Sequence, residues 1–259
     1  MDRRLFFKQV SATAALLTLS NVTAISKGIE KKESKTGSGR MLQLENNDTI
    51  VFTGDSITDG FREYKYYRVA NSIRALGNGY VELVASKLNY TFPNKNLKIY
   101  NTGINGDTIV KVLARLNTDV LDLKPTVVSI LLGVNDFNVA FSATGKGTPD
   151  VYETQYRELL TKIKTALPNV RFVLGEPYAI KGVREKIDVW YPEFNAYREV
   201  AKKMAEEFKA VFIPYQLIYE AAVSKAPKSY FTTDGIHPSL AGLGLVADAW
   251  FSYVDVNKK

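Results

Sequence analysis

Three residues of the types used in acyl transfer occur in two short segments far apart in the sequence. Ser56 follows an apolar run and begins SITDGF, whereas Asp234 and His237 stand in DGIHPS. His237 is the only histidine among 259 residues, and there is no cysteine. A serine hydroxyl becomes a strong nucleophile when a base removes its proton, and a carboxylate can orient that base. These residue types predict a Ser56–His237–Asp234 triad. The alternatives are structural: a helix cap at Ser56 and a turn at Asp234–His237.

The segments after the next two apolar runs supply groups for an oxyanion hole. Gly106 stands in NTGINGD, and Asn135 stands in GVND. The tetrahedral intermediate of acyl transfer needs N–H donors aimed at its oxygen. We expect these donors to be the Ser56 N–H, the Gly106 N–H, which no Cβ obstructs, and the Asn135 side-chain amide. Gly106 could instead serve only a tight turn, and Asn135 could cap a helix.

Apolar runs alternate with amphipathic segments along the chain. The runs that read as strands are 49–53, 97–103, 126–133, 170–177 and 210–214, and helical spacing occurs over 79–88, 107–121, 150–167, 192–208, 215–224 and 238–254. This alternation predicts an α/β domain in which a mostly parallel, five-stranded sheet has helices on both faces. Ligand sites of such folds lie outside the carboxyl ends of the strands. Ser56, Gly106 and Asn135 each follow a strand and should meet there.

Four short blocks of the sequence resemble those of the GDSL/SGNH hydrolases. They are Gly54-Asp55-Ser56, Asn101-x-Gly103-x-x-Gly106-Asp107, Gly133-x-Asn135-Asp136 and Asp234-x-x-His237-Pro238. The blocks occur in the order of that family and span nearly the whole domain, although Ile57 replaces the usual leucine. The resemblance implies a flavodoxin-like three-layer α/β/α sandwich and a serine esterase that works through an acyl-enzyme. It implies no cofactor, and one histidine without cysteine gives little support for a metal site.

The substrate is inferred from the family resemblance and from the aromatic residues. Exported members of this family often remove acetyl groups from polysaccharides, so we expect an acetylated oligosaccharide or polysaccharide, or a small ester. Aromatic side chains suit sugar rings, and the candidate substrate-binding residues are Asp55, Tyr64, Tyr67, Trp190 and Tyr191. Helix packing is an equally good explanation of the aromatic residues in 61–80. The other functions left open are a lysophospholipase- or thioesterase-like acylhydrolase and a non-catalytic carbohydrate-binding protein on the same fold.

The N-terminus reads as an export signal. Residues 1–24 combine basic residues, a short apolar stretch and a small-residue cleavage site, and Arg3-Arg4 resembles a twin-arginine signal. Segment 25–45 reads as a flexible linker, and 46–257 as the hydrolase domain. We therefore expect a periplasmic or secreted protein with no membrane span after cleavage. The net charge of +7 is spread along the chain, so we expect no nucleic-acid partner.

Overall fold

The structure is a computed structural model that describes residues 40–256. The expected signal peptide, 1–24, and most of the expected linker, 25–45, lie outside the described residues.

The centre of the domain is a parallel sheet of five strands. Their order across the sheet is β3-β2-β4-β5-β6. The strands are β2 (Thr49–Gly54), β3 (Lys98–Asn101), β4 (Val127–Leu131), β5 (Arg171–Gly175) and β6 (Val211–Ile213). Every residue of the central strand β4 is buried, because helices cover both faces of the sheet. All five strands expected from the apolar runs are therefore confirmed.

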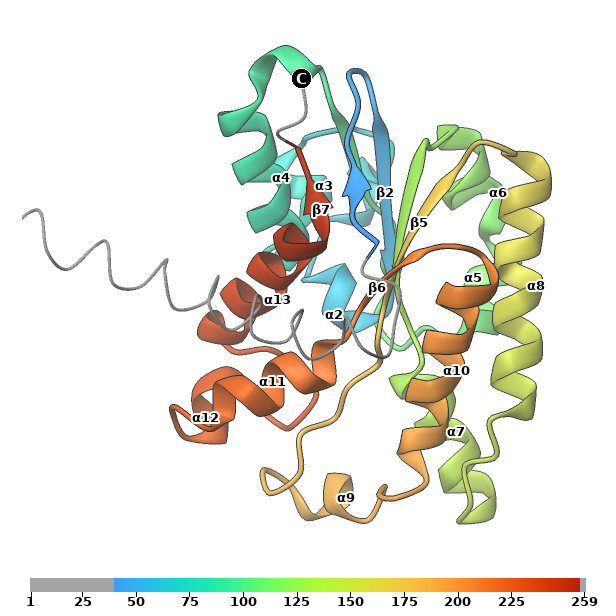
Figure 1. Cartoon of the computed structure of the whole chain (residues 1–259), viewed down its shortest axis with the longest axis vertical. Helices are drawn as coiled ribbons and strands as arrows, with labels where there is room; N and C mark the ends of the chain where they lie inside the picture. Colours follow the sequence, from blue (N-terminus) through green and yellow to red (C-terminus); the bar gives the residue numbers. More distant parts are fainter. Residues whose placement is uncertain (1–39, 257–259) are drawn as a thin grey trace, which may run out of the picture. The chain divides into compact units, whose positions relative to one another are not determined.

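Helices lie on both sides of this sheet, as Figure 1 shows. One side carries α4 (Tyr80–Thr91) and α13 (Leu240–Tyr253), and the other carries α5 (Ile109–Ala114), α8 (Asp150–Ala166) and α10 (Phe194–Glu207). The three-layer α/β/α sandwich is thus confirmed. The helix α11 (Tyr215–Val223) follows β6. The short elements are α2 (Ser56–Asp59), η1 (Tyr64–Tyr66), α3 (Ile73–Leu76), η2 (Pro93–Lys95), α6 (Leu116–Asp119), η3 (Leu121–Leu123), α9 (Glu185–Asp188) and α12 (Lys228–Phe231).

Two helical segments differ from the expectation. The helix expected over 107–121 is divided at Arg115 into α5 and α6, and α7 (Val134–Thr144) occupies a segment for which no helix was expected. Gly133 precedes α7 with a φ of 132°, a backbone conformation that favours glycine. The abrupt turn from β4 into α7 therefore favours glycine at position 133.

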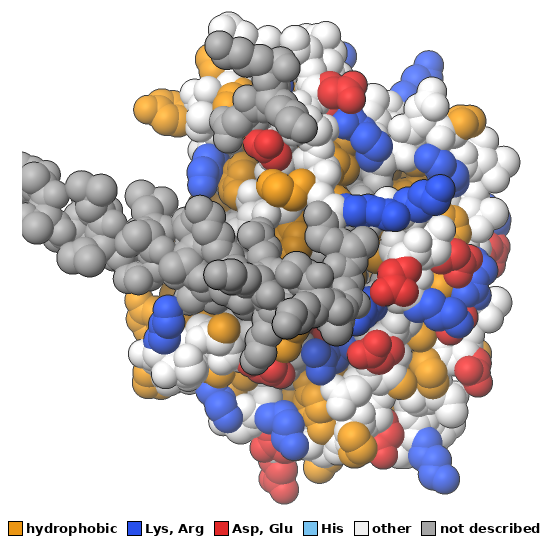
Figure 2. Space-filling view, viewed as in Figure 1, with side chains coloured by type: hydrophobic (Ala, Val, Ile, Leu, Met, Phe, Trp, Pro, Cys, Tyr) orange, Lys and Arg blue, Asp and Glu red, His pale blue; other side chains and the backbone are white. Residues whose placement is uncertain are grey.

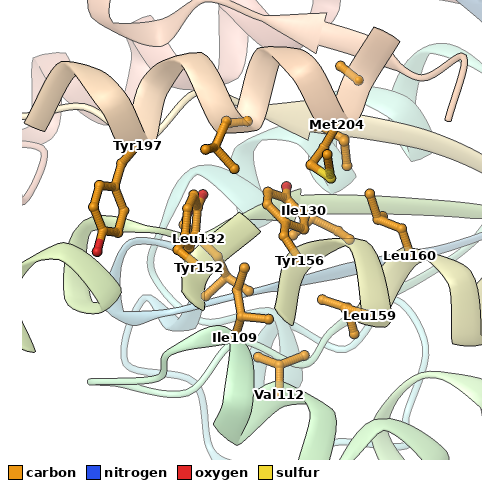
Figure 3. Packing of buried hydrophobic residues seen from close by; sticks show 14 of the residues in the cluster. Ile109, Val112, Ile130, Leu132, Tyr152, Tyr156, Leu159, Leu160, Tyr197 and Met204 are labelled. Carbon is orange, nitrogen blue, oxygen red and sulfur yellow. The ribbon is translucent and has the colours of Figure 1, made fainter. Parts of the chain in front are cut away.

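A large apolar core fills the layer between β4 and the helices α5, α8 and α10. Apolar side chains recur on one face of α8 at helical spacing, and this face is buried. Figure 3 shows these side chains meeting those of the neighbouring elements: Ile109 and Val112 from α5, Ile130 from β4 and Leu132 directly after it, Tyr152, Tyr156, Leu159 and Leu160 from α8, and Tyr197 and Met204 from α10. This packing fixes the carboxyl end of β4.

The strand order also fixes where a ligand can bind. From β2 the chain crosses outward to β3 and then returns to β4 on the other side of β2. Connections that leave in opposite directions open a crevice outside the carboxyl ends of the two central strands. Here these strands are β2 and β4, so the residues that follow Gly54 and Leu131 lie at this crevice.

The two ends of the described chain form a second, small sheet. Strand β1 (Leu42–Gln43) pairs in parallel with β7 (Val254–Asp255), and both Leu42 and Leu44 are buried. The folded part therefore begins a few residues before the expected boundary at 46. Leu42 and Leu44 alternate with polar residues and follow a polar segment, so the sequence pattern does not distinguish β1 from the linker.

Charged side chains of both signs are distributed over the surface. On the face drawn in Figure 2, side chains of both signs are visible, and a few Lys and Arg side chains lie close together at the upper right. Within residues 40–256, no helix has the length and apolar character needed to cross a membrane.

Candidate active site

Ser56 is placed by an abrupt turn at the end of β2. Gly54 closes the strand, and a Cβ there would lie 2.3 Å from the Thr58 hydroxyl oxygen, so only glycine fits. Asp55 then caps α2, because its Oδ1 accepts the Ile57 N–H at 3.0 Å. Ser56 is consequently the first residue of α2, at the crevice, and its side chain is only partly buried.

The structure brings the histidine to the serine. His237 Nε2 lies 2.9 Å from Ser56 Oγ, although 181 positions separate the two residues. His237 Nδ1 lies 2.8 Å from Asp234 Oδ2. The expected contact between these three side chains is therefore present, in the order hydroxyl, imidazole, carboxylate.

The loop between α12 and α13 holds the imidazole in this position. Asp234 Oδ1 accepts the backbone N–H groups of Ile236 at 3.0 Å and His237 at 2.7 Å, and the Thr232 hydroxyl donates to the His237 carbonyl at 2.9 Å. Burial by itself would raise the pKa of Asp234, but the hydrogen bonds from His237 and Ile236 bring that pKa below its ordinary value. Asp234 is thus an anion that favours the Nδ1–H tautomer and leaves the Nε2 lone pair facing Ser56.

Two further loops carry Gly106 and Asn135, the other residues expected to donate to an oxyanion. The Ile104 N–H donates to the Gly54 carbonyl at 3.1 Å, so the loop after β3 lies against the end of β2. Gly106 in this loop has a φ of 75°, and no atom lies within 4 Å of the place a Cβ would take. The N–H groups of Ser56 and Gly106 donate to no residue of the described chain. Both donors are therefore available to a ligand.

The Asn135 side chain links the loop after β4 to the loop after β3. Its Nδ2 donates one hydrogen to the Asp107 carbonyl at 3.0 Å, in the residue that follows Gly106. This bond orients the amide and leaves its second N–H for a ligand. Asn135 lies within the first turn of α7 and is not its cap, so the alternative role as a cap does not apply.

Asn101 ties the end of β3 to α2. Its Nδ2 donates to the carbonyls of Thr58 and Leu76, each at 2.7 Å, and its Oδ1 accepts the Gly103 N–H at 2.9 Å. The side chain is completely buried. The role of Asn101 is therefore to hold the short helix that carries Ser56.

Three buried aspartates lie behind these loops. Burial raises the pKa of Asp55 to about 7, with further contributions from the charges of Asp136 and Asp107. Burial likewise raises the pKa of Asp136 to about 6, although its Oδ1 accepts the Ile109 N–H at 2.9 Å. Asp107 pairs with Arg115 at 2.8 Å. Among residues 40–256, no group of three or more His, Asp or Glu side chains is arranged to hold a metal ion.

The structure corrects two of the expected substrate-binding residues. Trp190 is 2% exposed and packs against Phe137 with ring centroids 5.2 Å apart, so it belongs to the apolar core. Asp55 is 1% exposed and is occupied in capping α2. Neither side chain has surface to offer a substrate. Position after a strand indicates which edge a residue is near, but it does not indicate whether its side chain points outward.

The three tyrosines remain at the surface. The Tyr64 ring is about half exposed, lies 4.6 Å from the Arg62 guanidinium, and donates its hydroxyl to Asp59 at 2.9 Å. Tyr67 and Tyr191 are partly exposed. A contact between these rings and a substrate remains a prediction.

Comparison with known proteins identifies the family. The model of the GDSL-like lipase/acylhydrolase family matches residues 52–244, which include all four sequence blocks. The chain belongs to this family. An acetylxylan esterase of Geobacillus stearothermophilus is 30% identical over 213 residues, which cover 81% of this chain and 94% of the relative. A solved structure of that esterase has a TM-score of 0.70 and 30% identity, over 81% of this chain and 95% of that chain.

Two other relatives extend the comparison. A GDSL-like lipase structure from Parabacteroides merdae superimposes with a TM-score of 0.77 and 38% identity, over 82% of this chain and 98% of that chain. An uncharacterized lipoprotein of Bacillus subtilis is 32% identical over 118 residues, 44% of this chain and 40% of the relative. Family and fold agree with the expectation from the four sequence blocks. This member of the GDSL-like family is a carboxylic ester hydrolase.

Proposed function

We propose that the protein is a serine esterase that removes acetyl groups from carbohydrate. The observation that carries this proposal is the 2.9 Å contact between Ser56 Oγ and His237 Nε2, with Asp234 on the other ring nitrogen. In this proposal Ser56 is the nucleophile and His237 is the general base. Asp234 orients the imidazole and stabilises its protonated form.

The first half of the reaction forms an acyl-enzyme. His237 Nε2 takes the proton of Ser56 as the hydroxyl oxygen attacks the ester carbonyl, and the carbonyl oxygen becomes an oxyanion. The N–H groups of Ser56 and Gly106 and the free N–H of the Asn135 amide donate to it. Collapse of the intermediate breaks the ester bond, and His237 gives its proton to the leaving sugar oxygen.

The second half releases the acid. A water molecule loses a proton to His237 Nε2 and attacks the acyl carbon, so the oxyanion forms again between the same donors. The bond to Ser56 Oγ then breaks, and His237 returns the proton to the serine oxygen. Acetate leaves, and the free hydroxyl is restored.

Carbohydrate as the substrate is supported by the relatives. The chain aligns with 94% of an acetylxylan esterase at 30% identity. Solved structures of that esterase include variants described as catalytic mutants, in which a serine, an aspartate or a histidine is replaced by alanine. The aspartate and histidine are three positions apart there, as Asp234 and His237 are here.

Hydrolysis of small esters by the protein and its variants tests the mechanism. Wild type should hydrolyse p-nitrophenyl acetate, and Ser56→Ala should remove essentially all of this activity. Asp234→Asn keeps the shape of the site but loses the anion, so kcat should fall roughly 10³- to 10⁴-fold. Activity that survives in Ser56→Ala would contradict the role of the serine.

Two comparisons separate the rival functions. Esters from acetate to palmitate distinguish a deacetylase, which prefers the short chain, from a lysophospholipase- or thioesterase-like enzyme. Release of acetate from acetylated xylo-oligosaccharide distinguishes a carbohydrate esterase from a general one. Binding of oligosaccharide without any turnover of either ester would favour the non-catalytic function.

Export is part of the same proposal. It rests on the basic and apolar pattern of residues 1–24 and on the similarity to a lipoprotein of Bacillus subtilis. N-terminal sequencing of the protein recovered from outside the cytoplasm should give a first residue after Ala24. A chain that retains Met1 and stays in the cytoplasmic fraction would contradict export.

A further inference from the structure

A pocket lies on the far side of the segment that bonds to the loop carrying Asp234 and His237 by way of Ile180. It has a volume of about 380 Å³, within the range of ~300–1,000 Å³ that is usual for small-molecule sites. The segment after β5, the helices α10 and α11, and the first residue of α12 form its walls. In Figure 1, α11 and α12 lie side by side at one end of the sheet.

Two lining residues of this pocket, Ile180 and Lys228, are connected to the loop that carries Asp234 and His237. The N–H of Ile180, a lining residue, donates at 2.7 Å to the carbonyl of Gly235, which lies between Asp234 and His237. Lys228, another lining residue, begins α12. That helix ends directly before Thr232, whose hydroxyl holds the His237 carbonyl. Residues of the pocket are therefore bonded to, or continuous in the chain with, the loop that carries Asp234 and His237.

The charge of the pocket is positive. Lys181, Arg198 and Lys228 line it, against the single carboxylate of Glu220. Arg198 is already neutralised, because it pairs at 2.8 Å with the buried carboxylate of Glu176. Lys181 and Lys228 form no salt bridge with any residue between 40 and 256. Two ammonium groups are therefore free to bind an anion.

The surroundings of each ammonium group place it at the lining of the pocket. Gly182 follows Lys181 and has a φ of 76°, and its missing Cβ would lie 2.4 Å from the Lys228 Nζ. The Lys228 ammonium group thus occupies space that a side chain at residue 182 would fill. The Lys181 ammonium group lies 5.4 Å from the centre of the Tyr191 ring. Both ammonium groups therefore contribute to the lining of the same pocket.

The other lining groups suit sugar hydroxyls. Asn195 is a carboxamide whose oxygen accepts from Arg198 at 2.8 Å, so its orientation is fixed and its N–H groups face away from that bond. Glu220 accepts from the Gln216 amide at 2.9 Å and has acceptor capacity left for a hydroxyl. The partly exposed Tyr191 ring adds an apolar surface. An aromatic ring, a carboxamide and a carboxylate are the groups with which proteins bind a pyranose, and the lysines add the preference for an acid.

We infer that this pocket binds a sugar unit that carries a carboxylate, within the same oligosaccharide whose acetyl ester lies at Ser56. This inference rests on the proposed function and names a substrate class for it: an acetylated polysaccharide with uronic acid units. The carboxylate meets Lys181 and Lys228, and the sugar hydroxyls meet Asn195 and Glu220. Because the lysines are exposed to solvent, the attraction weakens as the ionic strength rises.

Binding to the full chain tests the inference without relying on catalysis. The probes are a xylo-oligosaccharide with one glucuronic acid branch and the same oligosaccharide with its carboxylate reduced to the alcohol. Calorimetry should show roughly five- to tenfold tighter binding of the acid at low salt, as expected for two exposed ion pairs. The doubly substituted variant Lys181→Gln/Lys228→Gln should lose this preference. The matched control is Lys98→Gln/Lys124→Gln, two exposed lysines at the other end of the strands, which should keep it.

The kinetic counterpart uses acetylated forms of the two oligosaccharides. Wild type should deacetylate the acidic oligosaccharide with a higher kcat/KM than the reduced one. In the Lys181→Gln/Lys228→Gln variant, the ratio of these two kcat/KM values should fall to near one. Equal affinity of wild type for the acidic and the reduced probe would overturn the inference, whatever the esterase assay shows. Lysine-dependent binding in a protein without Ser56-dependent hydrolysis would support the pocket and overturn the proposed function instead.

Discussion

Asp55 and Asp136 are buried carboxyl groups that have little compensation for a negative charge. Asp55 accepts the Ile57 N–H, and Asp136 accepts the Ile109 N–H. The second carboxyl oxygen of Asp136 is buried without a partner in the described chain. An ionised carboxylate in such a place is costly, and burial therefore raises both pKa values. The loops that carry Gly106 and Asn135 thus depend on the protonation of the groups behind them.

This dependence predicts how stability changes with pH. Burial raises the pKa of Asp136 from 3.8 to about 6 in the folded protein. The folded state therefore holds the proton more tightly than the unfolded state, and the stabilisation, complete below pH ~4, is lost as the pH rises through 6. Asp136→Asn cannot ionise and keeps an oxygen for the Ile109 N–H. Between pH 4 and pH 8, ionisation of Asp136 should lower the free energy of unfolding of wild type by an amount on the order of 2–3 kcal/mol. The variant should not show this loss.

Urea unfolding at both pH values measures this difference. An effect of the new amide group that does not depend on pH is the same at pH 4 and pH 8. Only the difference between the free energies of unfolding at the two pH values therefore reports ionisation. Asp122→Asn removes a carboxylate that is about half exposed and serves as the control. Because Asp136 is intact in this variant, the loss of stability that ionisation of Asp136 causes between the two pH values should still be present. A curve for Asp136→Asn that runs parallel to wild type would show that Asp136 is not the group that titrates.

At the scale of the elements, the site depends on how three strand ends are joined. The loop after β3 lies against the end of β2 through the bond from Ile104 to Gly54, and it is joined to α7 through Asn135 and Asp136. Asn101 connects β3 to α2 and α3. Each donor proposed for the oxyanion hole is thus positioned by a neighbouring loop and not only by its own. Loosening one of these bonds should disturb the whole site.

Asn101→Ala should show this coupling. The substitution leaves the carbonyls of Thr58 and Leu76 and the N–H of Gly103 buried without their partner, so the free energy of unfolding should fall by roughly 2–4 kcal/mol. Because α2 carries Ser56, kcat for p-nitrophenyl acetate should fall as well in the fraction that remains folded. Asn89→Ala removes a single bond, to the Ala85 carbonyl, and should cost less than ~1 kcal/mol with kcat unchanged. Equal effects of the two variants would contradict the special role of Asn101.

The sequence predicts well those features that depend on local pattern. Apolar runs located all five strands, and the uniqueness of His237 indicated its contact with Ser56 across 181 positions. Features that depend on neighbours in space were missed. Asp107 stands two residues before α5, but it pairs with Arg115, and the N–H of Ile109 at the start of that helix donates to Asp136 from another part of the chain. Burial of Trp190 likewise depends on Phe137, which no pattern in the sequence places beside it.

At the scale of the whole domain, the two ends of the described chain stabilise each other. Strand β1 pairs with β7, directly after α13, and Leu42 and Leu44 are 5% and 1% exposed. Arg171, at the start of β5, donates to the Gln43 carbonyl and to Asp48. The segment around β1 therefore bridges the last helix and the central sheet. It is part of the domain, although its sequence continues that of a polar linker.

Shortening the chain from its N-terminus tests where the domain begins. A chain that starts at residue 41 keeps β1 and should unfold at the same temperature as one that starts at residue 25. A chain that starts at residue 46 lacks Leu42 and Leu44, whose burial stabilises the folded state by about 1.5–3 kcal/mol each, and it also exposes the edge of β7. Its free energy of unfolding should be lower by roughly 3–5 kcal/mol in urea titrations. If the chains from 41 and 46 are equally stable, β1 contributes nothing and the linker extends to residue 45. If the chain from 41 is already weakened relative to the chain from 25, residues before Met41 belong to the folded domain as well.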